Sequence, residues 1–252
     1  MFTVRPNVTL ILDNNIVLHG HGQNNAPLVV VNGGILRMNT GATITGNTNP
    51  NGRAFGEQHG GGGIRVASGT FELNGGTISY NTSNSGGGVL VLLGATFVMT
   101  NGTIAGNTAS AGGGGVLVFG QAGNGAGTFT MRGGIITGNT ASSGGGVSMG
   151  VASGVSRSSF TMSGGSITGN TAINSGGGVR APDHARISFT KTGGIITGYA
   201  NDRVNGNVVR DGSGHVIARS GHAVFAGENR RRETTAGTGV NLNNRAVGGW
   251  DS

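Results

Sequence analysis

The chain contains no cysteine, which excludes disulfide bonds and thiolate metal sites. No run of 18 apolar residues occurs, so the sequence predicts no transmembrane helix. The N-terminal residues also lack the apolar run of a signal peptide. We therefore expect either a cytoplasmic protein or a fragment or processed form of an exported one. The second is favoured, because strand-like sequence starts at once, at Val8.

Charged residues are also few, and acidic ones are the scarcer kind. The 16 Lys and Arg outnumber the 9 Asp and Glu, which gives a net charge of +7. Ten of the 16 basic residues follow residue 179, but they are scattered, and the aromatic residues do not lie beside them in the sequence. We therefore do not expect nucleic acid as a partner.

Glycine is abundant, with 55 residues, and much of it belongs to a repeat. Glycine does not recur at every third position, which excludes collagen. A typical copy of the repeat, residues 127–140, reads GTFTMRGGIITGNT. Its apolar positions recur regularly, and this argues against a disordered Gly-rich segment.

The copies share fixed spacings. Each Phe is followed after seven residues by an Ile and after three more by an Asn, which is Tyr199 in the fifth copy. The Phe residues are Phe71, Phe97, Phe129, Phe160 and Phe189; the Ile residues are Ile78, Ile104, Ile136, Ile167 and Ile196; the Asn residues are Asn81, Asn107, Asn139 and Asn170. A third apolar position, the Val register, follows a run of glycines in each copy, as at Val89. The number of residues from this position to the next Phe varies from 7 to 13. A period of about 25–32 residues with one free link is typical of a solenoid, in which units bury their apolar faces by stacking.

Each copy holds three short pieces with alternating apolar and polar residues, separated by Gly-rich corners. Phe129 and Met131 share one side, and Thr128 and Thr130 the other, which is the period of a strand. The sequence therefore predicts an all-β fold: a single-stranded right-handed parallel β-helix (a β-solenoid) with three short strands per coil and about six to seven coils. Like residues would stack on like residues, with Phe, Ile and Val inside and an Asn ladder at a corner.

Three regions are expected along the chain. Residues 1–60 form irregular N-terminal coils and a polar loop, and residues 61–199 form the regular repeats. Residues 200–252 form a capping hairpin or coil and a polar tail. Asp211-Gly212 lies between two strand-like runs, which is a hairpin signal. A solenoid needs such a cap, because open strand edges promote aggregation.

The run GGGGV followed by GTFTMRGGIITGNTAS, at residues 112–142, and its counterpart at residues 144–172 carry a resemblance to a known family. They resemble the Gly-rich right-handed parallel β-helix repeats of bacterial surface proteins, which include adhesin-like and polymorphic outer-membrane-type proteins. The opening NVTLILDNNIVLHG resembles the flank of such repeats, so the resemblance covers nearly the whole chain. It implies a cell-surface or extracellular location and carries no catalytic residues.

Other parallel β-helices cleave polysaccharides with paired carboxylates or bound Ca²⁺. Between residues 60 and 180 the one acidic residue is Glu72, so no such pair is expected in the repeats. His19 and His21 lie two residues apart without a third ligand, which is a weak metal signal. We therefore expect no catalytic residue, no metal site and no cofactor.

The variable link between the Val and Phe registers is the favoured binding side, because insertions on one side of a solenoid often mark its binding face. It carries long insertions at residues 120–127 and 150–158. Beside it, Leu90, Leu92, Leu117 and Phe119 are expected to face outward, either as an exposed apolar stripe that marks a partner site or with the insertions folded over them. The polar candidates on this side are Arg157, Arg180, Asp183, His184 and Arg186.

A second surface is an outward rank of Thr and Ser, of which Thr128 and Thr130 are examples. Such ranks resemble those of ice-binding proteins, but Glu72 and Val98 interrupt this one. Hydroxyl groups on the solvent side of a strand need no special role, so we expect only solvent exposure here.

These observations favour a non-enzymatic, adhesin-like surface or secreted protein that binds a host or matrix protein or a glycan. The first alternative is an enzyme acting on a polysaccharide, and the second is a structural spacer within a larger surface protein. We expect a monomer or part of a longer chain.

Overall fold

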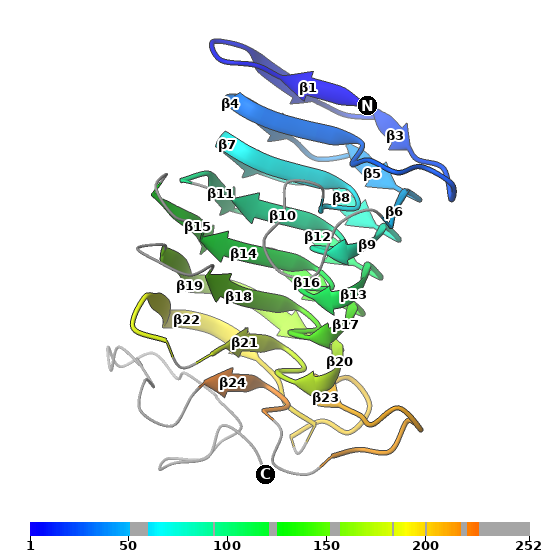
Figure 1. Cartoon of the computed structure of the whole chain (residues 1–252), viewed down its shortest axis with the longest axis vertical. Coiled ribbons are helices and arrows are strands. Elements are labelled where there is room, and N and C mark those ends of the chain that lie inside the picture. The colour runs from blue at the N-terminus through cyan, green and yellow to red at the C-terminus, as the bar shows by residue number, and fades with distance from the viewer. Residues whose placement is uncertain are drawn as a thin grey trace.

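The computed structural model describes residues 1–50, 60–92, 94–120, 125–151, 157–182, 184–199, 201–217 and 221–226. Within these ranges the fold consists of strands and turns, with no helix. Figure 1 shows the strands stacked in successive coils from the N-terminal end of the rod to β24. All strand pairs named below are parallel, and the predicted parallel β-helix is confirmed.

Two sides of the rod are named here after the side chains that they direct inward. The Val face contains β1 (Phe2–Val4), the first parts of β4 (Val29–Met38) and β7 (Ile64–Leu73), β10 (Val89–Leu92), β14 (Val116–Gly120), β18 (Val147–Val151), β21 (Val179–Ala181) and β24 (Val224–Ala226). The Phe face contains β2 (Thr9–Leu12), the later parts of β4 and β7, β11 (Thr96–Met99), β15 (Ala126–Met131) and the first parts of β19 (Arg157–Thr168) and β22 (Ile187–Ile196).

The other two sides follow the Phe face along each coil. The Ile face contains β3 (Val17–His19), β5 (Thr43–Thr45), β8 (Thr77–Ser79), β12 (Thr103–Ala105), β16 (Ile135–Thr137) and the ends of β19 and β22. The Thr face contains β6 (Thr48–Asn49), β9 (Thr82–Ser85), β13 (Thr108–Gly112), β17 (Thr140–Ser143), β20 (Thr171–Ser175) and β23 (Val208–Val209). The Thr face is a fourth strand position, in addition to the three expected from the repeat.

The predicted Phe rank is confirmed as a stack along the axis of the rod. The ring centroids of Phe71, Phe97, Phe129 and Phe160 lie 4.5 to 4.7 Å apart, with interplanar angles of 10° or less. Phe189 continues the stack at 5.1 Å. This spacing matches the separation of neighbouring strands, so the backbone register sets the ring separation. The stacked rings, with the Ile and Val ranks, form one continuous buried core.

The predicted Asn ladder is confirmed and longer than expected. It comprises Asn47, Asn81, Asn107, Asn139, Asn170 and Asn207, all fully buried. The Oδ1 of Asn81 accepts the backbone N–H of Asn47. In each later rung the Oδ1 accepts both the backbone N–H and the Nδ2 of the preceding Asn, as Asn139 does from Asn107 at 2.9 and 3.0 Å. Each Nδ2 also donates to a backbone carbonyl, as Asn139 does to Ile104 at 3.0 Å. Asn24 donates to Asn47 Oδ1 at 2.6 Å and so extends the ladder toward the N-terminal end.

Glycine is required where the coils turn from the Thr face to the Val face, because backbones of neighbouring coils come very close there. A Cβ on Gly87 or on Gly114 would lie 2.5 Å from the carbonyl oxygen of the glycine one coil further on. No side chain fits at that distance. The corner before each ladder Asn is less strict, since Tyr80 holds a φ of 53° at a position where other copies have Gly.

The C-terminal end of the described rod continues the coil. Asn207, and not Tyr199, occupies the ladder position of this coil. The strands β23 and β24 pair with β20 and β21. Between these strands, Arg210 pairs antiparallel with Val216 across the turn at Asp211. His222 stands where the previous coil has Gly177, and it is 1% exposed. The predicted polar tail, residues 228–252, and residues 51–59 of the predicted polar loop lie outside the described residues.

We predict that Asn139→Ala destabilises the rod by about 3 kcal/mol or more, because it leaves buried donors and acceptors on both neighbouring coils without partners. Thermal and urea unfolding followed by circular dichroism measure the loss. Asn174→Ala is the matched control, since Asn174 is exposed and, among the described residues, its side chain donates to the Ser142 hydroxyl alone. Equal stability of the two variants would contradict a structural role for the ladder.

We predict that the rod loses stability as the pH falls below about 6.5, the ordinary pKa of histidine. Burial, and then the charge of Arg210, lower the pKa of His222. Its Nδ1 accepts the backbone N–H of Val209 at 2.9 Å, and Tyr199 lies beside its ring. The unfolded chain therefore binds a proton more readily than the fold, so the stability from His222 is complete above the unfolded pKa and is lost at lower pH.

The variant His222→Asn tests this pH dependence, because Asn offers an acceptor at the same distance along the side chain but does not titrate. Urea unfolding of the wild type and the variant at pH 7.5 and pH 5.5 measures the difference. The wild type is expected to lose more stability than the variant between the two pH values. An identical loss in both proteins would show that His222 does not contribute.

Candidate functional site

The outward positions of the Thr, Phe and Ile faces are occupied mainly by small hydroxyl side chains. The Thr face carries the unbroken rank Thr48, Thr82, Thr108, Thr140 and Thr171. The Phe face carries Thr70, Thr96, Thr128, Ser159 and Ser188. In the next outward rank of the Phe face, the Glu72 carboxylate accepts from Arg37 Nε at 2.6 Å, which raises the pKa of Arg37. The interruption expected at Glu72 and Val98 is present in this rank.

The Val face is different. Its outward column runs Thr3, Val30, Arg65, Leu90, Leu117, Ser148, Arg180 and Phe225. The strands alternate as the sequence predicts, with residues such as Val89 and Val91 in the main core and the column directed away from it. Apolar, hydroxyl and cationic side chains therefore share one column.

The prediction of an exposed apolar stripe is wrong. Leu90, Leu92, Leu117 and Phe119 form a separate buried cluster in which no side chain is more than 3% exposed. Glycine backbone approaches the cluster closely: Gly60 lies against Leu90, and Gly150 against the ring of Phe119. The alternation along β10 and β14 gave the direction of these side chains correctly, but it carries no information on how closely Gly60 and Gly150 approach them.

Two arginines flank this cluster in the same column. Arg65 lies next to Leu90, and Arg180 lies beyond Ser148. Burial lowers the pKa of both guanidinium groups. Within the described residues, the Nε of each is buried without a hydrogen-bond partner, as is the Oγ of Ser148, whose side chain is fully buried next to Arg180. Buried polar atoms without a hydrogen bond are rare in folded proteins, and a bound ligand is one way to supply the missing bond.

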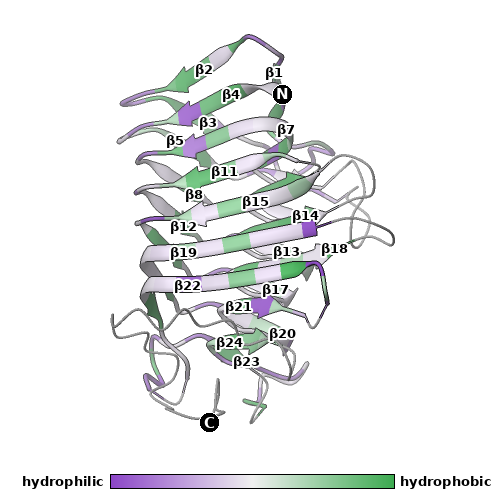
Figure 2. Ribbon diagram, turned by 90° about the vertical axis from the view of Figure 1, so that its left-hand side faces the viewer, coloured by the Kyte–Doolittle hydropathy of each residue, from purple (hydrophilic) through white to green (hydrophobic). Residues whose placement is uncertain are grey.

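Three of the predicted polar residues lie at the corner between the Val face and the Phe face. Arg157 begins β19 and is exposed, and its neighbour Ser158 donates a backbone N–H to the carbonyl of Arg186 at 3.0 Å. His184 Nδ1 accepts the backbone N–H of Arg186 at 3.2 Å, so its ring orders the link into β22. Figure 2 shows the hydrophilic start of β19, the hydrophilic link before β22 and the hydrophilic patch on β21 on the same side of the rod.

The structure therefore brings Arg157, His184 and Arg186 together on neighbouring coils, with Arg180 on the adjoining strand β21. Asp183, predicted with them, lies outside the described residues, as do residues 121–124 and 152–156 of the two predicted insertions. The described ends of both insertions flank the same corner, because β14 and β18 lead into them and β15 and β19 follow them.

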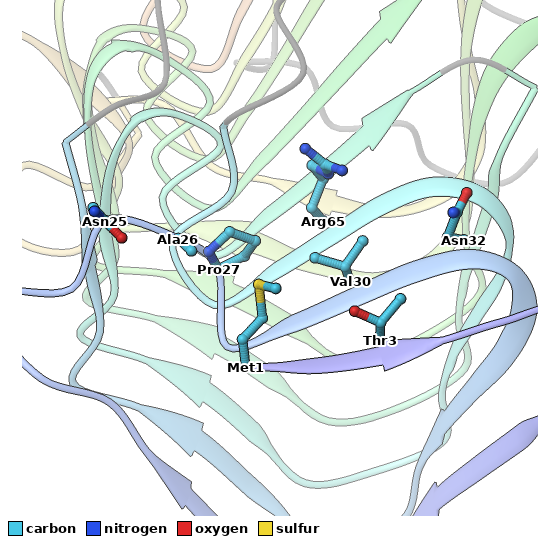
Figure 3. Close-up of a pocket in the computed structure, with 8 residues that line it drawn as sticks. All are labelled: Met1, Thr3, Asn25, Ala26, Pro27, Val30, Asn32 and Arg65. Carbon is cyan, nitrogen blue, oxygen red and sulfur yellow. The ribbon is translucent and has the colours of Figure 1, made fainter.

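A pocket of about 380 Å³ lies near the other end of the Val face, beside Arg65 (Figure 3). Its walls include Thr3 and Val30 from the outward column, Asn32 from β4, and Pro27. Sequence reasoning missed this pocket, since nothing in the repeat shows how the segment before β4 packs across β1.

Among the described residues, neither His19 nor His21 has two further metal-ligating side chains beside it. His19 Nδ1 lies 2.7 Å from the carbonyl oxygen of Gly20, and His21 Nδ1 accepts the backbone N–H of Gln23. In the part of the chain that the structure describes, no group of three His, Asp or Glu side chains could hold a metal ion.

Comparisons with protein-family models, with curated proteins and with solved structures found no match to this chain. The resemblance to Gly-rich repeat proteins of bacterial surfaces therefore stays a prediction. Among the described residues there is also no helix long and apolar enough to cross a membrane.

Proposed function

We propose that the chain is a non-enzymatic, adhesin-like binding module, displayed on a bacterial surface or secreted, that engages a protein or glycan partner at one corner of the rod. The observation that carries the proposal is the position of Arg157 and Arg186 on neighbouring coils where the Val face meets the Phe face, with Arg180 on β21, the Val-face strand that leads to this corner. We name these three residues, with His184, the basic corner.

Arginine suits this role because its planar guanidinium forms paired hydrogen bonds with carboxylate, sulfate or phosphate groups. No described carboxylate is bonded to Arg157, Arg180 or Arg186, whereas Arg37 on the Phe face is paired with Glu72. The described carboxylates Asp13, Glu72, Asp202 and Asp211 belong to other segments of the rod. We take the basic corner as the site that receives an acidic group of the partner.

The rod also supplies rigidity. Paired strands already hold these side chains in place, so the protein loses little conformational entropy when a partner binds. A small entropy loss favours affinity. The insertions at residues 120–127 and 150–158 leave and rejoin the rod at the same corner. Variable segments on a rigid scaffold commonly carry recognition, so the basic corner and these segments together form the proposed binding side.

We predict that the combined variant Arg157→Gln, Arg180→Gln and Arg186→Gln weakens binding to its best ligand on a glycan or matrix-protein array at least about tenfold. Arginine is enriched among the few interface residues whose truncation costs about 2 kcal/mol or more, so one such residue among the three accounts for a tenfold loss. Arg132→Gln is the matched control, since Arg132 is exposed at the opposite end of β15, after Met131. Raising the salt concentration should weaken the wild-type interaction in the same direction.

Thermal unfolding of each variant separates lost binding from lost folding. Wild-type binding that persists in the folded triple variant would contradict the proposed site. Turnover of an acidic polysaccharide by the wild type would contradict the proposed function and favour an enzyme. An array on which the wild type binds nothing would favour a structural spacer.

A further inference from the structure

The pocket beside Arg65 is a second site, distant from the basic corner. Thr3, Val30 and Arg65 lie in register on β1, β4 and β7, and all three face the pocket. Arg65 and Arg180 are separated by four steps between neighbouring strands in the outward column, or about 19 Å at the usual strand spacing. A ligand in this pocket therefore makes contacts that the basic corner does not provide.

Arg65 is the charged side chain of the pocket lining. Its Nε is buried without a partner, and its side chain forms no hydrogen bond or ion pair in the described part of the chain. A guanidinium stays protonated in such surroundings, and a cation removed from water is stabilised by an anion that pairs with it. Figure 3 shows the Arg65 side chain on the side of the pocket opposite Met1 and Thr3.

The remaining walls combine uncharged polar groups with apolar surface. Asn32 Oδ1 accepts the hydroxyl of Ser68 at 3.2 Å, which leaves the Asn32 amide nitrogen as a donor. The Thr3 hydroxyl can donate or accept. Pro27 and Val30 supply the apolar part of the lining. A volume of about 380 Å³ is at the small end of ligand pockets.

From these features we propose that the pocket binds a single sugar acid, a monosaccharide unit that carries one carboxylate. The carboxylate pairs with the Arg65 guanidinium, the ring hydroxyls bond to Asn32 and Thr3, and the apolar face of the ring packs on Val30 and Pro27. An uncharged sugar leaves Arg65 without its anion. This site does not rest on the proposed function, because it uses none of the residues of the basic corner.

The test is a titration of the whole chain with sodium glucuronate at low ionic strength, by calorimetry and by two-dimensional NMR. We expect saturable binding in the millimolar range, with shift changes at Thr3, Val30 and Asn32, and no binding of glucose. Arg65→Gln should weaken glucuronate binding at least tenfold, and Arg65→Lys should weaken it less. Arg132→Gln is again the matched control, and it should bind like the wild type.

Several results would overturn this assignment. They are the absence of saturable glucuronate binding, equal binding by wild type and Arg65→Gln, or binding restricted to longer uronate chains. If Arg65→Gln does not fold, the sites of the shift changes in the wild type decide the question. The basic-corner triple variant should keep full glucuronate binding, so failure of this site and failure of the proposed function are told apart.

Discussion

The structure depends on one constraint: backbone hydrogen bonds between successive coils hold equivalent residues directly above one another. Because the coils are one strand spacing apart, identical side chains meet at contact distance, as the Phe rings do at 4.5 to 4.7 Å. The same spacing lets each Asn carboxamide bond to the next one. A single short sequence pattern thereby produces a long core, a polar ladder and the close glycine corners.

This constraint also decides where function can be placed. In the five copies that contain Phe the link from Phe to Ile has a fixed length, and in four of them the link from Ile to Asn does too; the strands that these links join are in register. Among the regular coils the link between the Val and Phe registers varies most, from 7 to 13 residues, and residues that depart from the repeat accumulate on that side. Arg157 and Arg186 lie there, and Arg65 and Arg180 occupy positions on the Val face where other coils place leucine.

The repeat made the interior predictable, since the Phe, Ile, Val and Asn ranks all follow from spacing alone. The sequence also placed Leu90 and Leu117 outward correctly, but their burial depends on segments that do not repeat. Asn207 was missed because an insertion separates it from Ile196, although Gly206-Asn207 reproduces the Gly-Asn of the other copies. The Arg65 pocket was missed for a similar reason: its wall at Pro27 belongs to the irregular first coils.

The most direct measurement compares two insertions of one serine. The first lies between Arg132 and Gly133, in the fixed link between β15 and β16, and the second lies between residues 120 and 127, in the variable link. If register governs the fold, the first insertion moves Ile136 out of line with Ile104 and Ile167 and should lower the melting temperature strongly. The second should leave it almost unchanged. Equal effects of the two insertions would contradict the account.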